Sequence, residues 1–285
     1  MKLVSPRPVG AVACDLDGTL LRSDLTVSPR TRAALAAVEE QGILLVFVTG
    51  RPPRWIRPVS VQTDHRGLAI CANGALLYDL HTEQVVGADL LSVEVLTETI
   101  GLLREAVPGL AFAVEYGAGF AYEAAYPVTF EHRRTDIRMV TAAELLERAA
   151  AKLLVRHQER DSADLLAEVR VLVGQLAEVT HSTPVGPGLL ELSAAGVSKA
   201  TALARLCAGH GISADDVVAF GDMPNDLPML QWAGRPYAMA NANPDVLAVI
   251  PTRAPSNDED GVAVVLERLL SGSPDSTAAD PLPAG

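Results

Sequence analysis

Continuous apolar runs that end in polar residues dominate the first part of the chain. Three of them, GAVACDLD at 10–17, ILLVFVTG at 43–50 and GLAICANG at 67–74, have too few polar positions for strands with one solvated face. Such runs are typical of parallel sheets that helices cover on both faces. After the first run, Ser28 and Pro29 are a favourable N-cap and first residue for a helix. The alternation of strand and helix predicts a parallel α/β sheet.

The pattern changes between about residues 75 and 190. The apolar runs become shorter and alternate with polar residues, which is typical of antiparallel strands with one solvated face. Helices are predicted at about 92–106, 141–149 and 162–174. Helices laid on a largely antiparallel sheet would satisfy this pattern and make an α+β insert.

The strand and helix alternation resumes beyond the insert. Its predicted elements are a helix at 198–209, a strand at 217–222, a helix at 224–232, a strand at 237–241 and a helix near 259–271. We therefore predict an α/β fold with a Rossmann-like doubly wound parallel-sheet core at 1–76 and 189–272, interrupted by an inserted α+β domain at 77–188. Residues 273–285 are rich in Pro, Ser and Ala and are expected to be disordered.

Composition limits the class of protein. A chain of 285 residues, 49% hydrophobic and 20% charged, suits a soluble protein of two domains. No apolar run approaches the roughly 18 residues of a membrane span, and residues 1–10 lack the apolar stretch of a signal peptide. We therefore expect a cytoplasmic protein without a membrane partner. The net charge of −12 speaks against nucleic-acid binding, which needs a basic surface.

Cysteine and lysine are both rare. The three cysteines have no metal-type spacing and lie in apolar or helical surroundings, so we expect buried, reduced thiols. Among the 23 basic residues, three are lysines, at positions 2, 152 and 199. A lysine that this arginine-rich chain retains therefore needs an explanation.

Polar residues gather where the predicted core strands end. They are Asp15 and Asp17 after the first strand, Thr49, Gly50 and Arg51 after the second, Asn73 and Gly74 after the third, and Asp222, Asn225 and Asp226 after the strand at 217–222. Lys199 opens a predicted helix nearby. In open parallel sheets, ligands bind beyond the carboxyl ends of the strands. We therefore expect these residues to converge on one site.

The crowding of carboxylates around one lysine predicts a divalent cation. Oxygen ligands select Mg²⁺, which takes one or two protein carboxylates together with a substrate phosphate. Asp15 and Asp222 could supply them. Asp15 could then attack phosphorus and form an aspartyl phosphate that water hydrolyses. Asp17 could be the general acid for the leaving group and then the base for the water.

Other residues of the set suit the charge demands of phosphoryl transfer. Thr49 can donate a hydrogen bond to a phosphoryl oxygen, and Lys199 supplies a compact positive charge beside the nucleophile. Asn225 and Asp226 could orient the waters of the cation, hold Lys199 or cap the following helix. The candidate substrate contacts are Gly50, Arg51, Asn73 and Gly74. Arg51 could instead pair with an acidic side chain, and both interpretations stay open.

The chain resembles the haloacid dehalogenase-like hydrolases, specifically their metal-dependent phosphatases with a large type-two α/β cap. The matching motifs are DLDGTLL (15–21), VTGR (48–51), ANGA (72–75), GVSKATAL (196–203) and GDMPNDLPML (221–230). The resemblance implies Asp15 as nucleophile, Asp17 as acid and base, Thr49 and Lys199 on the phosphoryl group, and Mg²⁺ on Asp15, Asp222 and the backbone carbonyl of Asp17. The expected substrate is a small phosphorylated metabolite, such as a sugar phosphate, a nucleotide or a phosphorylated cofactor.

Two other functions stay open on the sequence alone. A phospho-accepting signalling domain also joins acidic residues, Mg²⁺, Thr and Lys on a doubly wound sheet, but it needs neither an acid at Asp17 nor an insert of this size. A phosphomutase or phosphotransferase would pass the phosphoryl group to a second hydroxyl instead of water. Oligomeric state is open.

Two basic segments receive a simpler interpretation. Arg54 and Arg57 recur on one helical face and are expected in solvent rather than in a ligand site. The cluster EHRRTDIR (131–138) within the insert is interpreted as exposed linker in preference to a grip for an anionic substrate.

Overall fold

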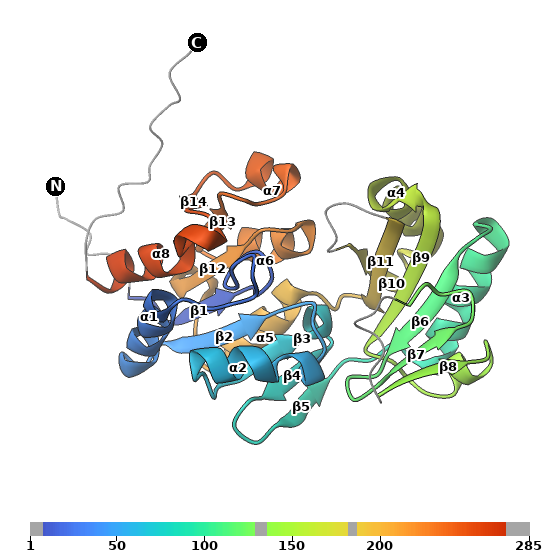
Figure 1. The fold of residues 1–285 in the computed structure, drawn as a ribbon, viewed down its shortest axis with the longest axis horizontal. Coiled ribbons are helices and arrows are strands. Elements are labelled where there is room, and N and C mark those ends of the chain that lie inside the picture. The colour runs from blue at the N-terminus through green and yellow to red at the C-terminus, as the bar shows by residue number, and fades with distance from the viewer. Residues whose placement is uncertain (1–7, 129–135, 182–186, 272–285) are drawn as a thin grey trace, which may run out of the picture.

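The computed structural model describes residues 8–128, 136–181 and 187–271, which form two layered parts (Figure 1). Within these residues, an eight-stranded sheet has the order β14-β13-β12-β1-β2-β3-β4-β5 and a six-stranded sheet has the order β10-β11-β9-β6-β7-β8. We call the part built on the larger sheet the core and the part built on the smaller sheet the cap.

The core sheet is parallel from β14 to β3 and antiparallel from β3 to β5. Its strands are β1 (Ala11–Cys14), β2 (Leu44–Val48), β3 (Leu68–Cys71), β4 (Leu76–Asp79), β5 (Gln84–Ala88), β12 (Val217–Gly221), β13 (Arg235–Met239) and β14 (Arg253–Ala254). Every residue of β1 and β12 is buried. Burial on both faces accounts for the unbroken apolar sequence of these two central strands.

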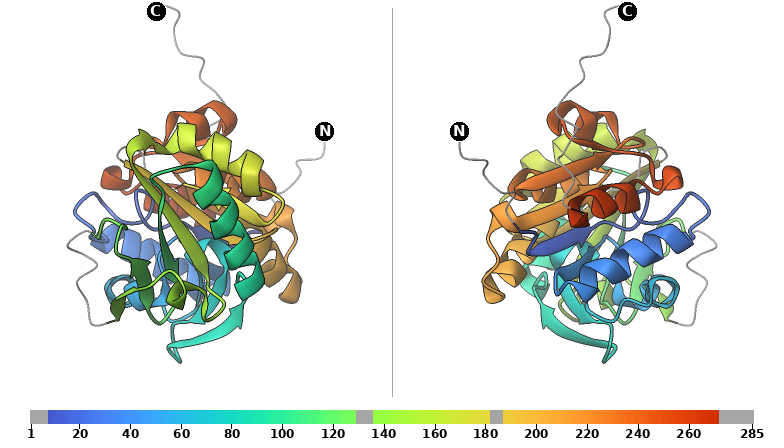
Figure 2. Two further views of the ribbon diagram at one scale, coloured as in Figure 1. Left: turned by 90° about the vertical axis from the view of Figure 1, so that its right-hand side faces the viewer. Right: turned by 90° about the vertical axis from the view of Figure 1, so that its left-hand side faces the viewer.

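Helices cover both faces of the core sheet (Figure 2). One face holds α1 (Pro29–Glu40), α2 (Arg57–Thr63) and α8 (Gly261–Leu270), and the other holds α5 (Lys199–Gly209), α6 (Leu227–Trp232) and α7 (Pro244–Val249). The start of α1 follows the prediction, because the Ser28 side chain accepts a hydrogen bond from the Thr31 N–H and Pro29 is the first helical residue. All three cysteines are buried free thiols.

The cap is one sheet covered by two helices. Its strands are β6 (Ala111–Glu115), β7 (Phe120–Glu123), β8 (Ile137–Val140), β9 (Lys152–Asp161), β10 (Ala177–Thr180) and β11 (Pro187–Ala194). The helices α3 (Val93–Ala106) and α4 (Ser162–Val173) pack on one face. The strands pair antiparallel except for β7 with β8.

The α/β class with an inserted α+β part is confirmed, but the sheets divide the chain differently from the predicted insert at 77–188. β4 and β5 extend the core sheet, and β11 of the cap sheet continues to Ala194. A hairpin at a sheet edge alternates apolar and polar residues as cap strands do. Alternation alone therefore assigned β4 to the wrong part.

The predicted helix at 141–149 is wrong. The structure has a single 3-10 turn there, Glu144–Leu146, in which Leu145 is the buried residue. The turn cannot continue as a helix because Ala150 already pairs with Leu91 through backbone hydrogen bonds in both directions.

Two further expectations concern disorder at the end of the chain and membrane-spanning segments. The predicted disorder of 273–285 lies outside the described residues. Among the residues that are described, no helix combines the length and the apolar character that crossing a membrane requires.

Candidate active site

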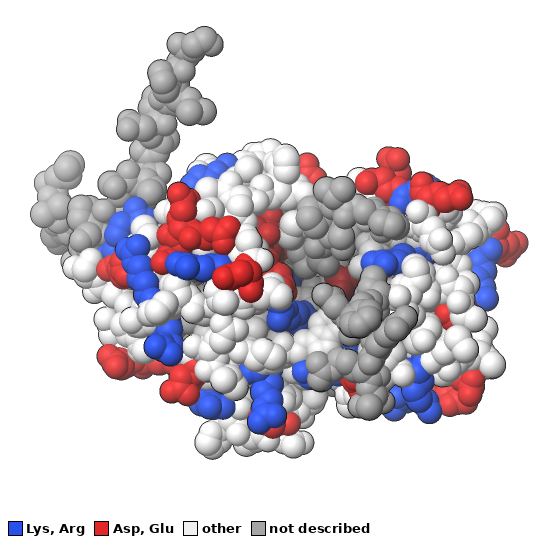
Figure 3. All heavy atoms as spheres, in the orientation of Figure 1, with Lys and Arg blue, Asp and Glu red and all other residues white. Residues whose placement is uncertain are grey.

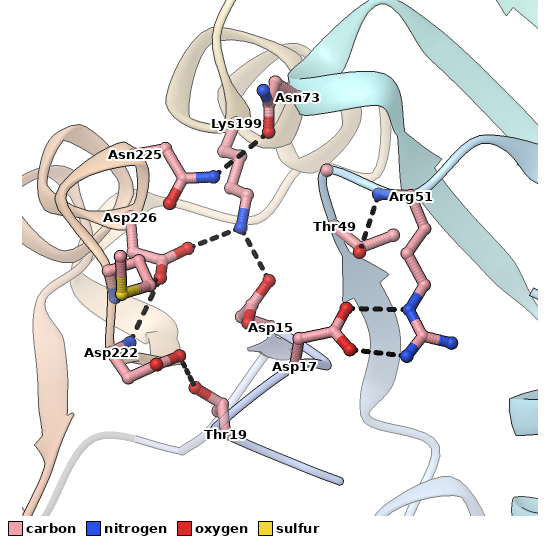
Figure 4. Close-up of polar contacts among 12 residues, drawn as sticks. Asp15, Asp17, Thr19, Thr49, Arg51, Asn73, Lys199, Asp222, Asn225 and Asp226 are labelled. Atoms are coloured by element: carbon pink, nitrogen blue, oxygen red, sulfur yellow. Dashed lines mark hydrogen bonds and ion pairs between the residues drawn. The ribbon is translucent and has the colours of Figure 1, made fainter. Parts of the chain in front are cut away.

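The core brings its polar residues together at the carboxyl end of the sheet (Figure 4). Asp15, Thr49 and Asp222 directly follow β1, β2 and β12, and Lys199 is the first residue of α5. Because parallel strands end at the same edge, residues that are far apart in the sequence converge there.

Lys199 joins two of these segments. Its Nζ donates hydrogen bonds to Asp15 Oδ1 and Asp226 Oδ1, each at 2.6 Å, and its side chain is 2% exposed. Helix α5 fixes its position, because Ser198 caps the helix by accepting a hydrogen bond from the Thr201 N–H. The buried ammonium therefore connects the end of β1 with the loop after β12.

The loop after β12 is held by its own carboxylates. Asp226 Oδ2 accepts hydrogen bonds from the backbone N–H groups of Asp222, at 3.1 Å, and Met223, at 2.9 Å. Thr19 Oγ1 donates to Asp222 Oδ1 at 2.7 Å. Gly18 has a φ of +78°, and a Cβ there would lie 2.4 Å from Asp222 Oδ2, so the motif requires glycine at this position. Sequence reasoning did not assign Thr19, although it follows Asp17 and Gly18 in the first motif.

The site holds more carboxylate than positive charge. Burial raises the pKa of Asp15 well above its ordinary value, and Asp226 and Asp222 add to this although Lys199 opposes it. Burial and the nearby Asp226 raise the pKa of Asp222 to about 7. Burial alone would lower the pKa of Lys199, but the carboxylates of Asp15 and Asp226 raise it above its ordinary value, so the amine stays protonated. Three carboxylates around one ammonium favour a bound cation.

The donor set fits a divalent cation with oxygen ligands. One ligand atom from each of Asp15, Asp222 and Asp226 lies within 4.8 Å of the others. Asp226 uses both oxygens for Lys199 and the backbone, whereas the contacts described above use one oxygen of Asp15 and one of Asp222. Asn225 Oδ1 is buried and has no hydrogen-bond partner among the described residues. Asp15 and Asp222 are therefore better ligand candidates than Asp226.

Asp17 forms a bidentate ion pair with Arg51. Arg51 Nε donates to Asp17 Oδ2 at 2.7 Å, and Nη2 donates to Asp17 Oδ1. The Arg51 backbone N–H donates to Thr49 Oγ1 at 3.0 Å. The Asp17 carboxylate, half exposed, thus points toward Arg51 and away from Asp15 (Figure 4). Of the two interpretations left open for Arg51, the structure shows the pairing with an acid.

Asn73 and Gly74, expected to contact substrate, lie behind the site and do not line the cleft. Asn73 Nδ2 donates to Glu191 Oε2 at 3.0 Å, and Asn73 Oδ1 accepts from Asn225 Nδ2 at 3.2 Å. Gly74 has a φ of +108°, and a Cβ there would lie 2.3 Å from the Ser198 carbonyl oxygen. Gly74 therefore permits the close approach of α5, and Asn73 orients Asn225 rather than a ligand.

A cleft of about 1290 Å³ separates the site from the cap. Asp15, Asp17, Thr49, Gly50, Arg51, Lys199 and Asn225 line it from the core. The cap contributes residues of β6, β7, β9 and β11, on the sheet face opposite α3 and α4. On the face of the molecule that Figure 3 shows, basic and acidic side chains are mixed on both parts.

A buried ion pair ties the cap to the core beside the site. Lys152 Nζ of β9 donates to the Gly50 carbonyl oxygen at 2.9 Å and pairs with Glu191 of β11. Both side chains are almost fully buried. This contact accounts for a second retained lysine. Two features of the sequence indicate this ion pair: lysine is rare in the chain, and Glu191 is a glutamate inside a largely apolar strand.

Arg54 is also a cleft residue, contrary to the expectation of a solvated face. Its side chain is 12% exposed and pairs with Glu115 and, at 2.5 Å, with Asp136. Arg57 is 79% exposed, as expected, although it also lines the cleft. Most of the basic cluster at 131–138 lies outside the described residues.

Known proteins resemble this chain along most of its length. The model of the haloacid dehalogenase-like hydrolase family matches residues 12–266. Pyridoxal phosphate phosphatase YbhA of Escherichia coli (strain K12) is 31% identical over 264 residues, which cover 88% of this chain and 95% of that protein. The 5-amino-6-(5-phospho-D-ribitylamino)uracil phosphatase YitU of Bacillus subtilis (strain 168) is 25% identical over 271 residues, covering 91% and 97%. The crystal structure of SMU.1108c from Streptococcus mutans UA159 matches with a TM-score of 0.80 and 26% identity, covering 92% of this chain and 99% of that one.

The fold, the motifs and these relatives define a hydrolase with an α/β core and a cap. The chain belongs to the haloacid dehalogenase-like hydrolases. The predicted class of activity, a phosphohydrolase, is confirmed.

Proposed function

We propose that this chain is a Mg²⁺-dependent phosphatase in which Asp15 accepts the phosphoryl group of a small phosphorylated metabolite and water then releases it. The observation that carries the proposal is the position of Lys199, whose Nζ lies 2.6 Å from both Asp15 and Asp226 at the base of the cleft. A fixed ammonium there stabilises the negative charge of a phosphoryl group bound beside Asp15.

Asp15 is the nucleophile of the first step. One of its carboxylate oxygens bonds to phosphorus while the bond from phosphorus to the ester oxygen breaks. Lys199 holds the Asp15 carboxylate in place, and the buried Thr49 hydroxyl donates a hydrogen bond to a phosphoryl oxygen.

Asp17 moves the protons. It donates one to the leaving oxygen, and its carboxylate then accepts one from the water that attacks the aspartyl phosphate, so that inorganic phosphate leaves and Asp15 is restored. Because Arg51 contacts both carboxylate oxygens of Asp17, we infer that Asp17 turns from Arg51 toward the leaving group during the reaction.

The proposed ligands of Mg²⁺ are Asp15 and Asp222, together with the Asp17 backbone carbonyl that the family resemblance implies. Bound there, the ion would neutralise charge on the phosphoryl oxygens. Thr19 keeps Asp222 in position through its hydroxyl, and Asp226 keeps Lys199 in position through its carboxylate.

The substrate class is supported by two kinds of evidence. The two phosphatases compared above are named for pyridoxal phosphate and for 5-amino-6-(5-phospho-D-ribitylamino)uracil, both small phosphorylated metabolites. The cleft is large enough for a whole metabolite and is bounded by the cap, which can exclude bulk water. The cytoplasmic location stays a prediction.

Removal of Mg²⁺ is expected to stop phosphate release. Purified protein would be assayed on a panel of phosphorylated metabolites for inorganic phosphate, with Mg²⁺, with a chelator, and with Mg²⁺ added back in excess. We expect the chelator to lower the rate at least about 100-fold and the added Mg²⁺ to restore it. An undiminished rate in the chelator would contradict metal dependence, and transfer of phosphate to a second hydroxyl without free phosphate would favour a phosphotransferase.

A further inference from the structure

Among the residues that the structure describes, the charged side chains that line the cleft are paired, with one exception. Lys152 pairs with Glu191, and Arg54 pairs with Glu115. Arg156 also lines the cleft, but its Nε is buried without a hydrogen-bond partner, and it forms no ion pair with any described residue. An unpaired guanidinium on a cleft wall is available to a ligand.

The register of β9 places Arg156 at the end of the cleft remote from the catalytic residues. Lys152, Leu154 and Arg156 alternate along one face of β9 and line the cleft, whereas Leu153 and Val155 pack under α3 and α4. Lys152 contacts Gly50 next to the site. Four residues further along a strand is about 13 Å, so Arg156 faces the part of a ligand that is distant from its phosphate.

The surroundings of Arg156 are apolar and aromatic. Its guanidinium carbon lies 6.0 Å from the centroid of the Tyr126 ring, and Tyr126 meets Phe120 edge to face at 6.0 Å between ring centroids. Leu154 and Leu189 line the same wall, and Leu189 is opposite Arg156 in the strand pairing. We call Phe120, Tyr126, Leu154, Arg156 and Leu189 the distal subsite.

The combination of a guanidinium with aromatic and leucine side chains favours some leaving groups of the phosphate ester over others. A sugar or polyol needs many polar partners, and the distal subsite offers the Arg156 guanidinium and the Tyr126 hydroxyl among apolar side chains. Aromatic and leucine side chains favour a flat, weakly hydrated ring. The planar fork of a guanidinium matches the two oxygens of a carboxylate.

We propose that the distal subsite binds the part of the substrate remote from phosphorus, and that this part is a flat ring carrying a carboxylate, which Arg156 binds. This inference rests on the proposed phosphatase function and narrows its substrate class.

The test uses phosphate esters whose leaving groups differ at one point. Benzyl phosphate, 3-carboxybenzyl phosphate and 4-carboxybenzyl phosphate are all primary alkyl esters, so their intrinsic reactivity is similar. With Mg²⁺, we expect the wild-type protein to have a kcat/KM about 10- to 100-fold higher for the better carboxybenzyl ester than for benzyl phosphate. Glycerol phosphate, a polyol ester, should be the poorest substrate.

The variant Arg156→Met should abolish this preference. It should lower kcat/KM for the carboxybenzyl ester about 10- to 100-fold and leave that for benzyl phosphate within about 3-fold. Arg156→Lys keeps the charge and should retain part of the preference, which guards against a folding defect in the first variant. The matched control is Arg160→Met on the same strand, where Arg160 pairs with Glu168 away from the cleft.

Failure of this inference can be told from failure of the proposed function. Hydrolysis of all esters without a carboxylate preference, or equal losses on both esters in Arg156→Met, would overturn the distal subsite alone. If the wild-type protein releases no phosphate from any ester, the proposed function fails. Calorimetric titration of the same esters into wild-type and Arg156→Met protein would then decide on the subsite, because the preference must also appear in binding.

Discussion

Replacing Asp15 by Asn is expected to lower kcat on any phosphate ester by about 10⁵-fold or more, because an amide cannot act as the nucleophile. The fold should persist. Asn has nearly the shape of Asp, and the change removes one of three clustered, buried carboxylates, while Asp226 still pairs with Lys199. In the absence of Mg²⁺, the midpoint of thermal unfolding should therefore equal or exceed that of the wild type.

The measurement is phosphate release together with thermal unfolding. Asp24→Asn is a matched control, since Asp24 is exposed and contacts Thr26 in a surface turn. The control should keep wild-type activity. If Asp15→Asn protein of normal fold retained more than a small percentage of the activity, Asp15 would not be the nucleophile.

Replacing Lys199 by Met is expected to damage both catalysis and stability. The change removes the fixed positive charge beside the nucleophile, which is worth about 10²- to 10³-fold in kcat by analogy with other preorganised donors. It also leaves Asp15 and Asp226 buried without their cation, a loss expected to cost about 3–5 kcal/mol in the free energy of unfolding.

Urea unfolding and steady-state kinetics would check both effects in the same samples. Arg205→Met on the same helix is the matched control, because Arg205 is 66% exposed and pairs with Asp89 at the surface. Lys199→Arg should recover little activity, since the Lys199 side chain is buried and a larger, planar guanidinium cannot take the place of its compact ammonium between Asp15 and Asp226. Lys199→Met protein with wild-type stability and a kcat within 10-fold of the wild type would contradict the role assigned here.

The core of the fold and the centre of the site were predictable because they follow from local sequence patterns. Unbroken apolar strands require a sheet covered on both faces, and such a sheet brings the residues after β1, β2 and β12 to one edge. Lys199 could be singled out because lysine is rare in this chain. Its contacts with Asp15 and Asp226 have the arrangement that the motifs predict.

Other features depend on contacts between distant residues that no local pattern records. The side chain of Arg51 could reach substrate or an acid, and the choice depends on where Asp17 lies. Gly74 resembles a substrate-binding turn in the sequence, yet its φ and its contact with Ser198 serve the packing of α5. Arg54 is largely buried because it pairs with Glu115, which belongs to the cap. The β4 strand alternates as a cap strand does and belongs to the core.

Chemical trapping of the phosphorylated enzyme tests the central claim, that Asp15 carries the phosphoryl group, most directly. Asp17→Asn protein would be mixed with Mg²⁺ and p-nitrophenyl phosphate, whose leaving group needs no proton. It should form the aspartyl phosphate, and the hydrolysis that releases inorganic phosphate should be slow. After an acid quench and digestion, peptide mass spectrometry should find one phosphoryl group on Asp15. Turnover with Asp15 unmodified, or with the phosphoryl group on another residue, would contradict the account.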